Sequence, residues 1–287
     1  MGHIVDISKW NDKINWGVAA PQIEFAICRV QYGSNLVDHL YNNHVAKLEQ
    51  YGIPHAAYAY GCYVSVADAI VEAKNFLARV NPNAKFLVLD VEDDTVKSMK
   101  SKGNLNDLAK ASQAFIDTCK AAGWKVGFYV AHHMYGDYNL QSVQADFVWL
   151  PRYGTNDGRP QKKPSYPCDI WQYTDNGYID GIGKVDINLL QGDKTLNWFT
   201  GEKQTEQAIT NGGYQYVKSY EFGTNYLNEA LQAMAERGTK GTVITDPLTG
   251  LCYIQTEVLP NPELDKITWW MDTRPEGKWY YEYIKVK

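Results

Sequence analysis

The chain has 287 residues, a formal net charge of −5, 45% hydrophobic residues and five cysteines. Its length suits one large domain and one small one, and its hydrophobic content excludes a disordered chain. An acidic balance without a basic block argues against a nucleic-acid partner. No apolar run approaches the roughly 18 residues that a membrane helix needs, so we expect no membrane partner.

The first two hundred residues contain eight short apolar runs separated in several places by helical spacing. These runs cover residues 3–6, 25–30, 56–60, 86–92, 126–130, 147–150, 169–173 and 185–188. Apolar residues recur at helical intervals over 66–80 and 105–121. Apolar strands that alternate with helices indicate a largely parallel sheet covered by helices. The predicted fold is α/β, an irregular TIM-like β/α barrel over residues 1–200, because some connections are short.

The rest of the chain has a different pattern. Residues 201–213 are polar and contain an Asn-Gly-Gly turn signal, so we predict a linker there. A strand over 214–222 and an amphipathic helix over 224–237 follow. Further strand candidates cover 242–245, 251–258, 266–271 and 279–286. We therefore predict a small α+β domain over residues 214–287, with a strand, a helix and then a meander.

The cysteines and histidines give no sign of a metal or redox site. The cysteines are widely spaced and odd in number, which fits neither a disulfide framework nor a CxxC pair. We expect the protein to fold in a reducing cytoplasm. His132 and His133 are adjacent, and adjacent strand residues face opposite sides, so polar loop positions are favoured over metal ligands. We expect no metal and no cofactor.

Two carboxylates stand at the end of the fourth apolar run. Asp90 and Glu92 are two residues apart, so in a strand they face the same side. Mutual repulsion raises one pKa, and the protonated group can then act as a general acid, as glycoside hydrolysis requires. The alternative is an exposed strand end that leads into the acidic loop Asp93-Asp94.

The other strand ends favour the catalytic interpretation. In a β/α barrel the C-terminal strand ends meet at one mouth, where active sites lie. The chemically useful side chains at these positions are Asp6, Tyr58, Tyr60, Tyr129, Trp149, Gln172 and Asp186. Together with Asp90 and Glu92 they would surround one cleft with four carboxylates and several rings.

Some nearby residues are assigned to other roles. We expect Asp68, Glu72, Asp93, Asp94 and Asp107 to be solvated. Trp16 is expected in the core, and Trp10 either in the core or on a subsite wall.

The same segments resemble a known enzyme family. The segments Asp6–Trp10, Asp90–Glu92, Ile170–Tyr173 and Val185–Asn188 are similar to the motifs of glycoside hydrolase family 25. They occur in the expected order over residues 1 to about 200. This family contains the Chalaropsis-type muramidases, many of them bacteriophage endolysins.

The resemblance implies hydrolysis of the β-1,4 bond between N-acetylmuramic acid and N-acetylglucosamine in peptidoglycan. Glu92 would be the general acid, and Asp90 would orient the 2-acetamido group or stabilise positive charge. Asp6 and Asp186 would flank the site. The Asp90–Glu92 spacing is similar to that of substrate-assisted glycosidases. The substrate contacts would come from Tyr58, Tyr60, Tyr129, Trp149 and Gln172.

Two other functions compete with this one. A non-catalytic glycan-binding protein on a hydrolase barrel is disfavoured because all four carboxylates are present. A chitinase-like enzyme would carry further acidic residues before Glu92, and residues 86–92 lack them.

The resemblance also implies where the enzyme acts. A phage lysin remains in the host cytoplasm until a holin opens the membrane, and then acts on the bacterial wall. The segment that begins the sequence does not look like a signal peptide.

We expect the tail to bind the wall, with a secondary wall polymer as a candidate ligand, because similar enzymes often carry a C-terminal binding module. The candidate wall contacts are Trp269, Trp270, Trp279 and Tyr281. The alternative is a structural appendage or a dimerisation module.

Overall fold

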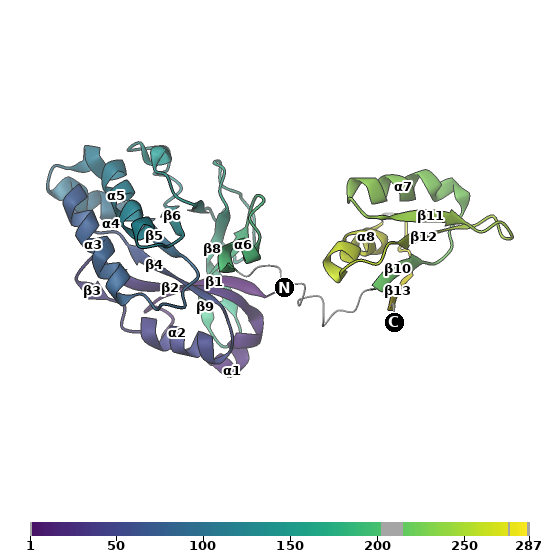
Figure 1. Ribbon diagram of the computed structural model, residues 1–287, viewed down its shortest axis with the longest axis horizontal. Coiled ribbons are helices and arrows are strands. Elements are labelled where there is room, and N and C mark those ends of the chain that lie inside the picture. The colour runs from purple at the N-terminus through teal and green to yellow at the C-terminus, as the bar shows by residue number, and fades with distance from the viewer. Residues whose placement is uncertain (1, 202–214, 275, 286–287) are drawn as a thin grey trace. The chain divides into compact units, whose positions relative to one another are not determined.

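A computed structural model describes residues 2–201, 215–274 and 276–285, and it divides into two compact units, Met1–Glu202 and Lys203–Lys287 (Figure 1). Apart from Gly201, the predicted linker lies outside the described residues. Over the described ranges, no helix combines the length and apolar character needed to cross a membrane.

The first unit is a closed barrel of eight strands. They are β1 (His3–Ile7), β2 (Ile23–Tyr32), β4 (His55–Tyr60), β5 (Leu87–Val91), β6 (Val126–Val130), β7 (Phe147–Pro151), β8 (Ile170–Ile179) and β9 (Gly183–Leu190). The first seven run parallel, and β1 pairs with β2. The last, β9, is antiparallel to both β8 and β1 and so closes the barrel. The short β3 (Leu36–Val37) adds to β2. The predicted eight-stranded α/β barrel is confirmed.

Helices cover the outside of this barrel unevenly. They are α1 (Trp16–Ala19), α2 (Tyr41–Gln50), α3 (Val66–Arg79), α4 (Asp93–Ser101), α5 (Leu108–Ala121) and α6 (Leu196–Thr200), with 3₁₀ turns η1 (Ala20–Gln22), η2 (Leu105–Asp107) and η3 (Leu140–Ser142). The hydroxyl of Ser65 accepts from the backbone N–H of Asp68 and so begins α3. The connections from β6 to β7 and from β7 to β8, both within the described residues, contain no α-helix, only the short η3 before β7, which explains the irregular shape.

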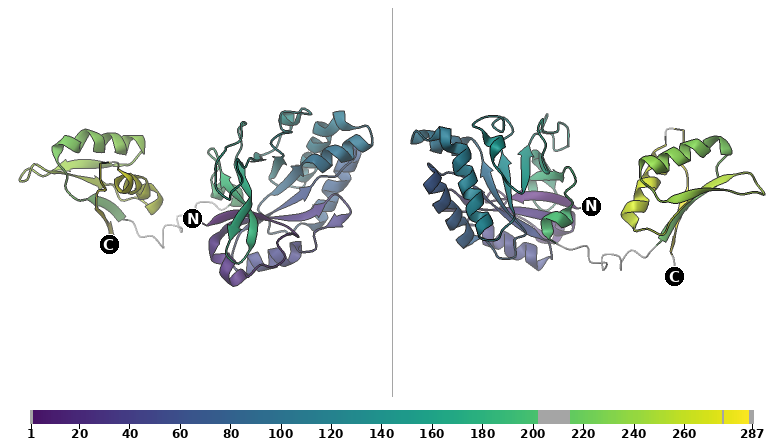
Figure 2. Two further views of the ribbon diagram at one scale, coloured as in Figure 1. Left: turned by 180° about the vertical axis from the view of Figure 1, so that it is seen from behind. Right: turned by 45° about the horizontal axis from the view of Figure 1, so that its top comes forward.

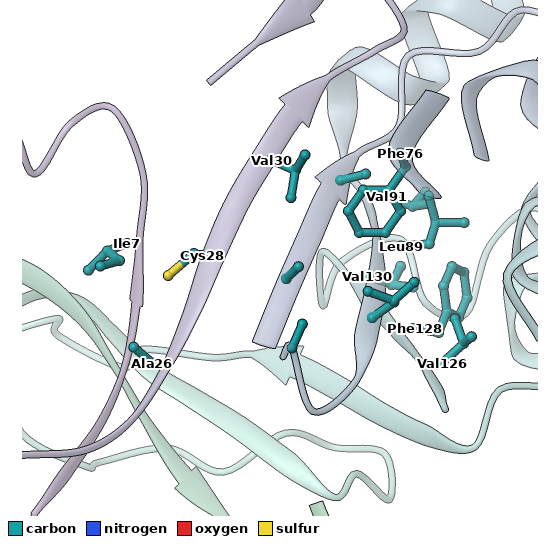
Figure 3. Close-up of a cluster of buried hydrophobic side chains, with 14 of the residues drawn as sticks. Ile7, Ala26, Cys28, Val30, Phe76, Leu89, Val91, Val126, Phe128 and Val130 are labelled. Atoms are coloured by element: carbon teal, nitrogen blue, oxygen red, sulfur yellow. The ribbon is translucent and has the colours of Figure 1, made fainter. Parts of the chain in front are cut away.

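Two apolar layers follow from the alternation of side chains along the strands. Outward-facing residues such as Cys28, Leu89 and Phe128 pack under the helices, where Phe76 of α3 meets Phe115 of α5 (Figure 3).

Inward-facing rings fill the lower barrel, namely Phe25, Phe86, Phe147 and Phe199. A Cβ at Gly127 would lie 2.2 Å from the Phe147 ring, so this layer has no spare room. The tightly packed rings therefore form a rigid layer beneath the polar side chains at the C-terminal ends of the strands.

The second unit is a four-stranded antiparallel sheet with two helices on one face (Figure 2). Its strands are β10 (Gln215–Ser219), β11 (Gly241–Thr245), β12 (Cys252–Thr256) and β13 (Tyr281–Lys285), in the order β11-β12-β10-β13. Its helices are α7 (Leu227–Glu236), preceded by η5 (Thr224–Tyr226), and α8 (Asn261–Thr273). Buried residues of the sheet and of both helices form one apolar core.

Two expectations for the tail are wrong. Residues 266–271 belong to helix α8 and are not a strand, because Leu264, Ile267 and Met271 recur at helical spacing and are all buried. The predicted meander also fails, because β10 lies between β12 and β13.

One expectation for the barrel is wrong as well. Glu72 is buried on the inner side of α3, where its oxygen Oε1 accepts from the backbone N–H of Cys62. Burial raises its pKa to about 8. Trp16 lies in the core as predicted, whereas Trp10 is 77% exposed.

Candidate active site

The polar side chains predicted at the strand ends meet inside the barrel mouth. They line a cavity of about 170 Å³ formed by Asp6, Tyr58, Asp90, Glu92, Tyr129, Trp149, Tyr153, Gln172, Asp175 and Asp186. All site residues predicted for the barrel line this cavity except Tyr60. That side chain does not line the cavity and stacks on Tyr32 with ring centroids 4.6 Å apart.

A second cavity, of about 410 Å³, adjoins the first. The two share Asp6, Tyr58, Asp175 and Asp186 as lining residues. The second adds Ser8, Trp10, Asn11 and Lys184. The exposed Trp10 ring therefore forms part of the rim of an extended groove, which suits a polymer more than a small molecule.

Asp90 and Glu92 form the first carboxyl pair. Asp90 ends β5, and Glu92 is held at the start of α4, where its backbone N–H donates to Thr95 Oγ1 at 3.2 Å. Burial and the charges of Glu92 and Asp6 raise the pKa of Asp90 well above its ordinary value. Burial raises the pKa of Glu92 to about 7. Among the described residues, oxygen Oδ1 of Asp90 is buried without a hydrogen-bond partner.

Asp6 and Asp186 form the second pair, because they are direct partners across the β1–β9 ladder. Burial and the neighbouring Asp6 and Asp175 raise the pKa of Asp186 to about 9. Burial also raises the pKa of Asp6, but hydrogen bonds from Asn188 and Gln172 oppose that rise. Asp6 is therefore the member of this pair best prepared to stay ionised.

Two amide side chains hold Asp6 in place. Gln172 Nε2 donates to Asp6 at 3.1 and 3.0 Å, and its Oε1 accepts from the hydroxyls of Tyr129 and Tyr153 at 3.0 and 2.6 Å.

Asn188 Nδ2 donates to Asp6 Oδ2 at 2.8 Å, and its Oδ1 accepts from Trp149 Nε1 at 2.8 Å. Each amide oxygen faces a donor and each amide N–H faces Asp6, so both orientations are fixed.

Comparison with known proteins identifies the barrel. Residues 5–182 match the model of glycosyl hydrolases family 25. The chain belongs to this family. Residues 236–283 match the PlyG cell wall binding domain. The family 25 chain is thus a peptidoglycan hydrolase of the lysozyme class with a wall-binding domain in its tail, as predicted.

Relatives agree with this assignment. The catalytic domain of the endolysin ply40 from bacteriophage P40 of Listeria monocytogenes is 32% identical, with a TM-score of 0.63 over 70% of this chain and 98% of that one. A glycosyl hydrolase 25 of Streptococcus pneumoniae, the virulence factor GHIP, is 26% identical, with a TM-score of 0.62 over 70% and 94%. The lysozyme of Streptococcus phage Cp-1 is 30% identical over 55% of this chain and 47% of the phage protein.

Three cavity or network residues of the family 25 barrel were missed from the sequence. Asn188 lies within a segment that resembles the family and Tyr153 closely follows β7, but a side chain that orients another carries no signal of its own. Asp175 lies in β8 where the pairing shifts between Gln172 and Gly177, and it accepts from Asn156 Nδ2 at 2.6 Å. A β-bulge changes which residues face inward, and alternation in the sequence does not reveal it.

Other parts of the chain offer less chemistry. Within the described ranges, no group of three or more His, Cys, Asp or Glu residues is arranged to hold a metal ion. A wider hollow of about 690 Å³, lined among others by His55 and Lys85, lies at the N-terminal end of the strands and has no carboxyl pair. The candidate catalytic groups therefore lie in the carboxyl-lined cavity at the barrel mouth.

Proposed function

We propose that this enzyme hydrolyses the β-1,4 bond that follows N-acetylmuramic acid, with Glu92 as the general acid. The observation that carries this proposal is the Glu92 carboxyl beside Asp90 at the barrel mouth, with its pKa raised by burial to about 7. A carboxyl of that pKa is protonated in a large share of molecules at neutral pH, as a proton donor must be.

The first step breaks the bond between the sugar C1 and the bridging oxygen. Glu92 gives its proton to that leaving oxygen, and the carbonyl oxygen of the substrate's own 2-acetamido group bonds to C1. Oxygen Oδ1 of Asp90 has no partner among the described residues, so it is an acceptor available to the acetamido N–H. Asp90 thereby orients the attacking group.

The second step reverses the roles. A water molecule gives its proton to Glu92 and bonds to C1, which opens the ring formed by the acetamido group. Asp6, fixed by Gln172 and Asn188, supplies a negative charge near the developing cation. Asp186 retains a proton at neutral pH, because its pKa is about 9, and donates it in a hydrogen bond to Asp6, which helps Asp6 to stay ionised. The rings of Tyr58, Tyr129 and Trp149 form the wall of the same cavity.

Product analysis tests this proposal. Wall fragments should end in a reducing N-acetylmuramic acid, which borohydride reduction and sugar analysis would detect. Reduced N-acetylglucosamine would show a glucosaminidase. Walls from which N-acetyl groups have been removed should resist cleavage, and normal cleavage of them would exclude the acetamido route.

For the tail we propose a targeting role, within the domain limits 1–200, 201–213 and 214–287. Two observations support it: the tail has its own apolar core, and it contains the wall-binding match. Tethering raises the local concentration of the barrel at its substrate. A fragment of residues 1–200 should cut soluble wall fragments normally and lose potency on intact cells. Equal potency of the fragment and the full chain would contradict targeting.

The route to the wall is a further part of the proposal. We propose that the enzyme accumulates in the host cytoplasm and reaches the wall after a holin opens the membrane. The five cysteines are all free, which suits a reducing compartment. Expression inside the host alone should leave cells intact, and a membrane-permeabilising agent should then cause lysis. Lysis without such an agent would contradict this route.

A further inference from the structure

The sheet of the tail has one covered face and one open face. Val217, Cys252 and Ile254 are fully buried against α7 and α8. Side chains alternate along a strand, so the neighbours of these residues point the other way. Lys218 and Tyr253 are such neighbours, and the Lys218 ammonium lies 4.3 Å from the centre of the Tyr253 ring. That contact places both on the open face.

Aromatic side chains cross this open face from strand to strand. Tyr253 of β12 is the direct partner of Ile244 of β11. Tyr220 follows Lys218 by two residues, and its backbone N–H donates to the carbonyl of Tyr280 just before β13. The rings of Tyr220 and Tyr280 lie 6.2 Å apart and are 58% and 65% exposed. We call Tyr220, Tyr253, Tyr280 and Ile244 the tyrosine stripe.

A polar row runs beside the tyrosine stripe on the same face. Lys218 of β10 pairs with Gln255 of β12 and with Glu282 of β13, and Gln255 pairs with Thr242 of β11. Glu282 also accepts from the hydroxyl of Tyr220 at 3.3 Å. The face thus combines exposed ring surfaces with a line of hydrogen-bonding groups of both charges.

The large tryptophans of the tail do not offer such a surface. Trp279 stacks on Phe222 at 4.2 Å, and Trp270 meets Trp279 edge to face at 5.2 Å, both at the apolar core. The hydroxyl of Tyr281 donates to Asp272 of α8, on the covered face. Of the four residues expected to contact the wall, only Trp269 is strongly exposed, at 64%, and it lies on α8.

We propose that the tyrosine stripe and its polar row bind a polysaccharide of the bacterial wall that the barrel does not cut. This inference rests on the proposed targeting role of the tail. Tyrosine offers a rigid amphipathic ring at low entropic cost, so a row of them matches the apolar faces of successive sugar rings. The polar row bonds the hydroxyls at the ring edges. The wall-binding match over residues 236–283 includes Ile244, Tyr253 and Tyr280.

The choice of an uncut polymer follows from the activity of the barrel. A tail that held the peptidoglycan strand would lose its anchor as the strand was cut. A polysaccharide attached to the wall but different from that strand keeps the enzyme in place through many cleavages. The ligand class is therefore a wall polysaccharide other than the substrate.

The experiment measures binding of the full chain to purified walls of a strain that it lyses. Tyr220→Ala with Tyr280→Ala should weaken binding at least about tenfold, since central aromatic anchors dominate interfaces. Trp269→Ala is the matched control and should bind as the wild type does. Cutting of soluble wall fragments and thermal melting should be unchanged in all variants. Walls stripped of secondary polysaccharide by hydrofluoric acid should no longer bind the wild type, and the released polysaccharide should compete.

Each other outcome overturns part of the argument. If the wild type does not bind walls, the targeting role fails. Suppose that the wild type binds, that Trp269→Ala abolishes binding and that the tyrosine variant binds normally. The wall then binds the α8 side of the tail and not the tyrosine stripe. If stripped walls bind fully, the ligand is peptidoglycan. If the tyrosine variant turns a dimer into a monomer and still binds walls, a second copy of the chain occupies the face.

Discussion

The two units bury charge in opposite ways. In the tail, Arg274 has 2% of its side chain exposed, donates to Glu229 at 2.7 and 2.9 Å, and lies 4.2 Å from the centre of the Trp279 ring. In the barrel mouth, five carboxyls line one cavity. Arg29, whose charge acts on Asp90, is itself held by Asp38 at 2.9 Å.

This difference distinguishes a buried charge that stabilises the fold from a charge cluster suited to catalysis. A buried charge that has its partners belongs to the fold, and removing one partner is costly. Carboxyls gathered without a cation of their own repel one another, which weakens the fold and raises their pKa values. A domain that retains such a cluster despite this cost is a candidate for catalysis.

The largest effect is expected at Glu92. Glu92→Gln should reduce the rate of wall hydrolysis at least ~10²-fold, because the proton donor is lost. Turbidity of a wall suspension measures the rate, and thermal melting checks the fold. The exposed neighbour Asp93→Asn is the control and should stay close to wild type. A folded Glu92→Gln enzyme with near-normal lysis would sink the assignment.

The second effect tests the paired charge of the tail. Arg274→Met should destabilise the tail by about 3 kcal/mol, since it leaves Glu229 unpaired and opens the ring cluster. Denaturant unfolding of the full chain, followed by tryptophan fluorescence, measures this. Cutting of soluble fragments should persist. Arg237→Met removes a surface pair of little worth. Equal stability of the two variants would contradict the role of Arg274.

A smaller effect is expected where the amides hold Asp6. Asn188→Leu removes a donor to the ionised carboxylate, so the pKa of Asp6 should rise. The acid limb of the pH–rate profile should move up by roughly one pH unit, because a hydrogen bond to a charged group is worth about 1.5–3 kcal/mol. Trp149→Phe, which removes the N–H bonded to Asn188 together with part of the buried ring and leaves the Asn188 donor to Asp6 in place, should move it less. An unchanged profile would show that Asn188 does not act through Asp6.

The smallest effect concerns Glu72, a buried carboxyl outside the mouth. Its pKa is raised from 4.5 to about 8 on folding, so its contribution to stability is complete below 4.5 and is lost as the pH rises through 8. Glu72→Gln should therefore match the wild type in melting temperature at pH 4.5. At pH 9 it should melt at least about 2–4 °C higher, the shift that each 1 kcal/mol of the lost stability produces in a domain of this size. Activity should not change. The partly exposed Asp107, which pairs with Lys110, provides the control, and Asp107→Asn should show no such trend. A Glu72→Gln melting curve that follows the wild type at every pH would contradict the prediction.

The barrel was predictable because the same sequence pattern, a short apolar run that ends in polar or aromatic residues, occurs at each of its strands. Its strands are continuous apolar runs, and the inward positions two residues apart hold Asp90 and Glu92 on one side. The antiparallel β9 and the bulge in β8 were not predictable, since both depend on how the barrel closes. The bulge is why Asp175 was missed, whereas Asn188 was missed because its role lies in orienting Asp6.

The tail was harder because its signals conflict. Residues 266–271 are rich in aromatic and β-branched side chains, which favour a strand locally. A helix is favoured instead by the proline in the first turn of α8 and by the burial of Leu264, Ile267 and Met271. Because α8 covers one face of the sheet, Trp270 and Trp279 pack at the apolar core. The tyrosines on the other face of the sheet are exposed to solvent.

The pairing of Asp6 with Asp186 has a consequence for the life of the enzyme in the cell. These carboxyls stand on the first and last strands of the barrel, so they meet only when β9 docks against β1. A growing chain emerges from its N-terminus, and most of the barrel must be synthesised before this closure. Fragments that end before Gly183 should therefore release no sugar from walls. Lytic activity is therefore expected only from chains long enough to complete the barrel.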